Sequence, residues 1–148
     1  MEDRYLFKAK RIDNGEWVEG YLSYPFCTKK GNESYYLYAK DSLGFFCRCV
    51  VDAYTICQCT GLKDKNGKLI WENDVVKQFA DCNELGNSLY FFYQIRWNNE
   101  YSAFEGYEIY TEETVLFPDL EDIEVIGNIF DNPELLEVRE WHLMKLKK

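Results

Sequence analysis

Short stretches in which apolar and polar residues alternate dominate this chain, as expected of half-buried β-strands. Two of these stretches, Tyr5–Ile12 and Glu16–Leu22, flank the tripeptide Asp13-Asn14-Gly15. Asn-Gly supplies the positive φ angles of a type I′ turn, which joins two strands tightly. The sequence therefore predicts an antiparallel hairpin at the start of the chain.

Further strands are predicted downstream, each bounded by polar or Gly-containing turns. They cover residues 35–39, 45–51, 60–65, 68–77, 90–97, 107–110 and 114–117. The continuous aromatic and branched run from Tyr90 to Trp97 indicates a well-buried strand, and Asp81–Ser88 indicates a polar loop before it. Asn66-Gly67 marks a second tight turn between extended segments.

The C-terminal residues carry the start signals of a helix. Asn132 is a suitable N-cap, Pro133 suits the first helical position, and Glu134 complements the positive end of the helix dipole. The residues at helical spacing after it are Leu135, Leu136, Arg139, His142, Leu143 and Leu146. The predicted fold is mainly β: an antiparallel rolled sheet or small barrel, SH3-like in part, with a short C-terminal helix docked on the sheet.

Length and composition point to one folded domain. A chain of 148 residues suits a single core over residues 1–148, and its 47% hydrophobic and 18% aromatic residues offset the entropy of ordering the chain. No apolar run reaches the roughly 18 to 20 residues of a bilayer-spanning helix, and the N-terminus lacks the apolar core of a signal peptide. We therefore expect a cytoplasmic protein without membrane contact.

The six cysteines are expected to be free thiols in that compartment. One residue separates Cys47 from Cys49 and Cys57 from Cys59, whereas zinc sites usually place two residues between paired cysteines. Residues i and i+2 share one face of a strand, so each pair is interpreted as two small apolar side chains on one side of a sheet. A metal site here stays the alternative, and the sequence predicts no cofactor.

The chain is acidic, because 26 Asp and Glu against 17 Lys and Arg give a formal charge of −9. This charge repels phosphate at long range and disfavours non-specific binding of nucleic acid, so a basic protein is the expected partner. The carboxylates predicted to form one acidic face are Glu112, Glu113, Asp119, Glu121 and Asp122. Lysine clusters at residues 63–68 and 145–148 leave local phosphate contacts open.

Groups suited to catalysis are few. His142 is the only histidine of the chain, and no nucleophile motif, phosphate-binding loop or dinucleotide fingerprint accompanies it. The acidic run Asp119–Glu124 is interpreted as a solvated loop, in preference to a site for metal-dependent phosphoryl chemistry. We therefore predict that the protein is not an enzyme.

The turn at Asn66-Gly67 brings together the residues most suited to binding. These candidates are Lys63, Asp64, Lys65, Asn66, Lys68, Trp71 and Asp74. One interpretation is a binding edge, with Trp71 as an aromatic anchor and the lysines as charge contacts. The other is turn chemistry, in which the Asp and Asn side chains bond nearby backbone and Asp74 braces the following strand.

The same region resembles a known family. Residues 58–76 are similar to the signature segment of the YopX-like family of phage proteins, with Cys59 and Asn73 standing where that family has an aromatic residue and a glycine. Further counterparts of the family's motifs are Phe7–Lys10, Glu16–Val18, Ile126–Ile129 and Asn132–Leu136. The resemblance implies an origin in bacteriophages or prophages, hence a bacterial host cell, and brings no established activity or catalytic residues.

Three functions remain open from the sequence. The favoured one is a non-catalytic accessory protein that binds a host or phage protein, with inhibition of a nucleic-acid-binding defence protein as a special case. The second is a small barrel that binds single-stranded nucleic acid, which requires a locally basic, aromatic face. The third is an uncharacterised enzyme. A homo-oligomer is a separate expectation, because exposed sheet edges and aromatic surface invite pairing.

Overall fold

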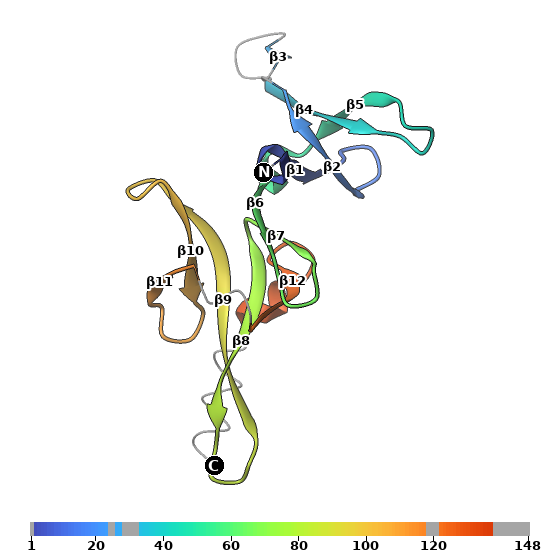
Figure 1. Ribbon diagram of the computed structural model, residues 1–148. Helices are drawn as coiled ribbons and strands as arrows, with labels where there is room; N and C mark the ends of the chain where they lie inside the picture. Colours follow the sequence, from blue (N-terminus) through green and yellow to red (C-terminus); the bar gives the residue numbers. More distant parts are fainter. Residues whose placement is uncertain (1, 24–25, 28–32, 118–121, 138–148) are drawn as a thin grey trace. The chain divides into compact units, whose positions relative to one another are not determined.

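A computed structural model describes residues 2–23, 26–27, 33–117 and 122–137 of the chain (Figure 1). These residues form antiparallel strands and short 3-10 helices, so the predicted mainly β fold is confirmed. The chain divides into two compact units, Met1–Gly61 and Leu62–Lys148, which are described separately below. The expectation of a single domain stays a prediction.

The first unit is built around short antiparallel strands. Its elements are η1 (Glu2–Tyr5), β1 (Phe7–Lys10), β2 (Trp17–Leu22), β3 (Phe26–Cys27), β4 (Glu33–Lys40), β5 (Phe46–Val51), η2 (Ala53–Thr55) and the first residues of β6 (Cys57–Lys63). The strands follow the order β3-β4-β2-β1-β6, and β5 also pairs with β4. Because side chains alternate along a strand, one face of this sheet forms the core, with Ala9, Leu37, Ala39, Cys49 and Val51 buried.

The predicted hairpin at the start of the chain is confirmed, since β1 pairs with β2 in antiparallel register. The type I′ turn is wrong. Gly15 has a positive φ of 71°, whereas Asn14 is absent from the residues with positive φ. The Gly15 N–H donates to the Arg11 carbonyl at 2.9 Å, and the Asn14 side-chain oxygen accepts from the Glu16 N–H at 2.9 Å. A longer loop closed by side-chain bonding therefore replaces the two-residue turn.

The second unit contains a five-stranded sheet. Its elements are β7 (Leu69–Trp71), β8 (Asp74–Cys82), β9 (Ser88–Asn98), β10 (Ala103–Glu108), β11 (Thr114–Leu116), β12 (Ile123–Asn128) and η3 (Pro133–Leu136). The sheet follows the order β11-β10-β9-β8-β12, while β7 neighbours β6. Its core comprises Ile70, Val76, Tyr93, Ile95 and Ile123. Strand β12 corrects the end of the loop that was interpreted at Asp119–Glu124, because Glu124 pairs with Lys77 in the β8–β12 ladder. Residues 119–121 lie outside the described residues.

One turn design recurs in three hairpins, at residues 41–45, 64–68 and 83–87. An Asp or Asn begins each turn, and a glycine with φ near +80° stands three residues later: Gly44, Gly67 and Gly86 have φ of 85°, 81° and 78°. The side-chain oxygen of the first residue accepts two backbone N–H groups, two and four residues on. The tight turn predicted at Asn66-Gly67 is confirmed in this form, in which only the glycine adopts positive φ.

Strands β8 and β9 extend past their neighbours as a two-stranded arm (Figure 1). The predicted loop Asp81–Ser88 is shorter in the structure, because β8 continues to Cys82 and β9 begins at Ser88, which leaves only the turn at residues 83–87. The prediction of a well-buried strand holds only near the middle of β9, where Tyr93 and Ile95 are buried. Toward the tip, Tyr90 and Phe91 are 37% and 45% exposed, since only the partner strand covers them.

The barrel alternative and the C-terminal helix are the two remaining predictions about the fold. Within the described residues the strand orders of both sheets run from one end strand to another, so neither sheet is a closed barrel. The described part of the C-terminal helix is the 3-10 turn η3, and Asn132 makes no side-chain capping bond to it. Its side-chain oxygen instead accepts from the Asn128 N–H at 3.3 Å. The rest of the predicted helix, residues 138–148, lies outside the described residues.

Candidate functional site

The central turn holds a buried carboxylate. Asp64 is 6% exposed, and one of its oxygens accepts from the N–H groups of Asn66 and Lys68, each at 2.9 Å. The other oxygen accepts from the Val125 N–H of β12 at 3.0 Å. Burial raises the pKa of Asp64, but these three N–H donors outweigh it and hold the pKa below its ordinary value. Asp64 thus joins the turn to β12 as a structural brace.

The other candidates near this turn divide into buried and exposed residues. Trp71 is 4% exposed, which removes it as a surface anchor, and Asp74 is 2% exposed and accepts from the Trp71 N–H at 2.9 Å. Lys65 forms an ion pair with Glu124 at 3.2 Å. These contacts favour turn chemistry. Lys63, Asn66 and Lys68 are exposed, and their binding to a partner stays a prediction.

The predicted acidic face is described only in part. Glu112, Glu113 and Asp122 are exposed, and Asp119 and Glu121 lie outside the described residues. One carboxylate that sequence reasoning missed is Glu108, which is 4% exposed and accepts from the N–H groups of Tyr110 and Thr111. These two hydrogen bonds stabilise the turn before β11, so we interpret Glu108 as a structural residue of that turn. A single acidic face stays a prediction.

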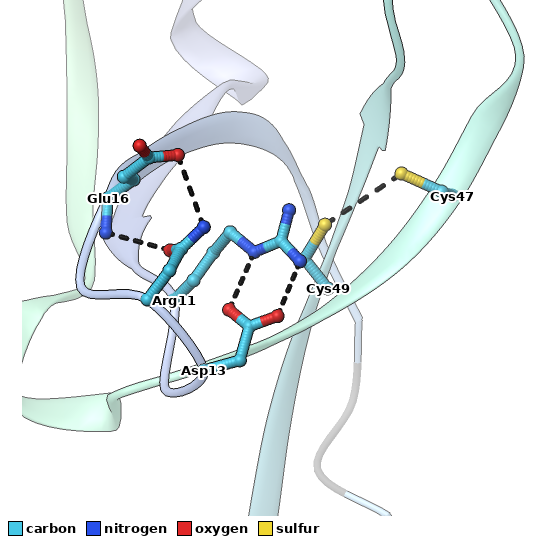
Figure 2. Close-up of polar contacts among 6 residues, drawn as sticks. Arg11, Asp13, Glu16, Cys47 and Cys49 are labelled. Carbon is cyan, nitrogen blue, oxygen red and sulfur yellow. Dashed lines mark hydrogen bonds and ion pairs between the residues drawn. The ribbon is translucent and has the colours of Figure 1, made fainter.

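The first cysteine pair lies on one side of β5, as expected. The sulfur atoms of Cys47 and Cys49 are 3.8 Å apart, and burial raises the pKa of Cys49, which keeps this thiol protonated (Figure 2). Cys57 and Cys59 are also buried. Among the residues that the structure describes, no group of three His, Cys, Asp or Glu side chains is placed to hold a metal ion. The absence of a metal stays a prediction.

Arg11 and Asp13 form a bidentate ion pair in the loop between β1 and β2 (Figure 2). The hydrogen bond from Arg11 lowers the pKa of Asp13, and the same bond raises the pKa of Arg11. Both side chains face solvent, so we interpret the pair as ordering this loop.

The outward face of the first sheet gathers aromatic and cationic side chains. We call this surface the aromatic–basic face. It comprises Lys8 and Lys10 of β1, Trp17 and Tyr21 of β2, Tyr36, Tyr38 and Lys40 of β4, and Phe46 and Arg48 of β5. One carboxylate, Glu19 of β2, lies on the same face opposite Lys8. Strand register aligns these residues, since Tyr21 stands opposite Tyr38 and Tyr38 stands opposite Arg48. Three adjacent strands thus contribute one row of side chains across the sheet.

Cations lie over several of these rings. The Lys8 and Lys10 ammonium nitrogens are 5.0 and 5.4 Å from the Trp17 ring centre. The Lys40 ammonium is 5.4 Å from the Phe46 ring, and the Arg48 guanidinium is 4.6 Å from the Tyr36 ring. The rings hold the positive charges close to the sheet surface. Tyr21 and Tyr38 remain 47% and 43% exposed at the centre of the face.

An open groove of about 660 Å³ lies along the aromatic–basic face. Strands β2 and β4 share only two paired positions, Tyr21 with Tyr38 and Leu22 with Leu37, and beyond them each strand pairs with a different neighbour. The two strands therefore diverge, and Trp17, Lys40 and Phe46 are among the residues that line the gap. The sheet topology creates this groove, which alternation along single strands did not predict.

Charge is distributed unevenly between the two units. The first unit contains eight acidic and eight basic residues, and the second contains 18 acidic and nine basic residues. The whole formal charge of −9 therefore belongs to the second unit. The aromatic–basic face, with four cationic side chains against the single carboxylate of Glu19, lies on the neutral unit, where long-range repulsion of an anionic partner is weakest.

Comparison with known proteins relates the chain to one family and to solved structures. The profile of the family described as "YopX protein" matches residues 6–137. The crystal structure of protein EF1440 from Enterococcus faecalis is similar over 88% of this chain and 96% of that chain, with 24% sequence identity and a TM-score of 0.50. At this identity the likeness shows the fold alone. No curated protein matches the chain, and no helix in its described part is long and apolar enough to cross a membrane.

Proposed function

The chain belongs to the YopX family, and from that premise we propose that it is a non-catalytic phage or prophage accessory protein that holds its partner on the aromatic–basic face. The observation that carries the proposal is the set of half-exposed aromatic rings and cations aligned across β2, β4 and β5. Exposed aromatic and Arg side chains around a groove are the residue types that dominate binding energy in interfaces.

A capture experiment tests this proposal. The tagged chain is used to retain partners from a bacterial host extract, beside a Tyr21→Ala/Tyr38→Ala variant and a Tyr54→Ala control. Tyr54 is 91% exposed and lies in η2, outside the aromatic–basic face, so it matches the change in chemistry without touching the site. We expect the double variant to lose the retained partner and the control to keep it. Equal retention by all three proteins would contradict the proposal.

A second candidate function uses the second unit. Its 18 acidic residues against nine basic ones favour a basic protein partner, as an inhibitor of a nucleic-acid-binding defence protein requires. The same capture experiment separates the two, with a Glu112→Lys/Glu113→Lys variant added. If this charge reversal abolishes retention of a protein partner while the Tyr21→Ala/Tyr38→Ala variant still retains it, the result would favour the acidic unit over the aromatic–basic face.

We also propose self-association through the β8–β9 arm. Phe79, Leu89 and Phe91 are 48%, 38% and 45% exposed near the arm's tip, and a lone two-stranded ribbon is marginally stable in water. We expect the molar mass measured by light scattering to exceed that of one chain and to fall to it in a Leu89→Ser/Phe91→Ser variant. A monomeric wild-type chain at high concentration would contradict this prediction.

A further inference from the structure

We infer that the aromatic–basic face binds single-stranded nucleic acid, an assignment that rests on the proposed function of that face. The ligand class follows from how two side-chain types combine. Tyr21 and Tyr38 present open rings from adjacent strands, and stacking on such rings is available to every base. Arg48 stands next in the same row. In the inferred complex its guanidinium contacts the phosphate next to a base stacked on Tyr38.

The outer part of the face repeats this combination. Lys40 lies opposite Phe46 in the β4–β5 ladder, and Lys10 lies opposite Trp17 in the β1–β2 ladder. A single strand of nucleic acid alternates bases with phosphates along its length, so it uses the rings and the cations together. An acidic peptide uses only the cations and leaves the open tyrosine rings without a partner.

The form of the groove favours a flexible strand over a duplex. It opens between β2 and β4, and its lining includes the rings of Trp17, Tyr38 and Phe46 together with the single carboxylate of Glu19. Bases must be unstacked to lie on these rings, which a duplex resists and a single strand permits. Base edges are not read by stacking, so we expect binding with little sequence preference.

Fluorescence anisotropy with labelled oligo(dT) and oligo(U) of about 12 nucleotides, a length within the range of known single-strand sites, tests the inference on the full chain. If the four cations each meet a phosphate, raising salt from about 50 to about 200 mM weakens binding roughly 50-fold. Loss of both tyrosine rings in Tyr21→Ala/Tyr38→Ala weakens binding at least about 30-fold. Tyr38→Phe, which keeps the ring, and the Tyr54→Ala control bind like the wild-type chain.

Absence of oligonucleotide binding at the lower salt, or binding that the double variant leaves unchanged, would overturn the inference. Circular dichroism of the double variant checks that its sheet is intact, since both tyrosines are half exposed. If oligonucleotides fail while the capture experiment still shows a protein partner lost with Tyr21 and Tyr38, the ligand assignment falls and the proposed function stands. If both experiments fail, both fall.

Discussion

Replacing Gly20 by alanine should destabilise the first unit by about 3 kcal/mol or more, because the new methyl group has no room. A Cβ at this position would overlap the carbonyl oxygen of Tyr38, a backbone atom that cannot rotate away. The strands β2 and β4 would have to separate where only two residue pairs join them. Urea unfolding followed by circular dichroism measures the loss, and amide hydrogen exchange of β2 and β4 localises it.

Gly44→Ala is the matched control for Gly20→Ala. Gly44 has a φ of 85° and open space around its Cβ position, so alanine there meets only the left-handed backbone penalty of about 1 to 2 kcal/mol. Gly20 has no such φ, and its requirement for glycine is steric. A Gly20→Ala protein as stable as the wild-type chain would show that β2 and β4 do not approach as closely as described.

Substituting Asp64 by alanine should cost the second unit about 3 to 5 kcal/mol, because three buried or half-buried N–H groups lose a charged acceptor. Those donors are the N–H groups of Asn66, Lys68 and Val125. Asp64→Asn retains one side-chain oxygen, so its free energy of unfolding should lie between those of the alanine variant and the wild-type chain. Urea unfolding near neutral pH gives the three free energies of unfolding.

Asp64 should also make the stability depend on pH. Its pKa in the folded chain lies below the ordinary value of about 3.9, so the folded state favours the carboxylate. This contribution is fully present above the unfolded pKa and is lost as pH falls through the lower, folded pKa. The gap in unfolding free energy between wild type and Asp64→Asn should therefore shrink below about pH 4. A gap that grows on acidification would contradict the assigned bonding.

Asp41→Ala provides the control for Asp64. Asp41 begins the same kind of turn and accepts from the Leu43 and Phe45 N–H groups, but it is exposed. In the alanine variant water can therefore accept from these two N–H groups in place of the carboxylate. We expect a loss below about 1 kcal/mol there. The difference between the two variants isolates the contribution of burial and of the bond to β12.

Local signals in the sequence predicted the fold class and most strands, because alternation and Gly-containing turns act over a few residues. Asn73 illustrates this well: it stands where the related family has glycine, and its φ of 67° confirms a left-handed backbone there. Strand β12 escaped prediction because the acidic run before it masked the apolar Ile123 and Val125. The arm was missed because Asp81–Ser88 contains a five-residue turn whose pattern, an Asx followed three residues later by Gly, was not considered.

The candidate site was predicted less well than the fold. Trp71 is adjacent to charged turn residues in sequence, but its side chain belongs to the core, which only the packing of β7 reveals. The alternation that predicted a strand at Glu16–Leu22 is consistent with Trp17 and Tyr21 lying on one face of β2. Sequence spacing did not show that Tyr38 and Arg48 align beside them, since that depends on which strands become neighbours and in what register.

Photo-crosslinking tests the central claim, that the aromatic–basic face is the binding surface, most directly. A 4-thiouridine oligonucleotide is bound to the full chain, irradiated, and the attached peptides are identified by mass spectrometry. We predict adducts on β2 and β4, at Tyr21 and Tyr38, and on the Phe46 end of β5. Adducts confined to the lysines of residues 63–68 or 145–148 would contradict the account and return the site to the central turn or the C-terminus.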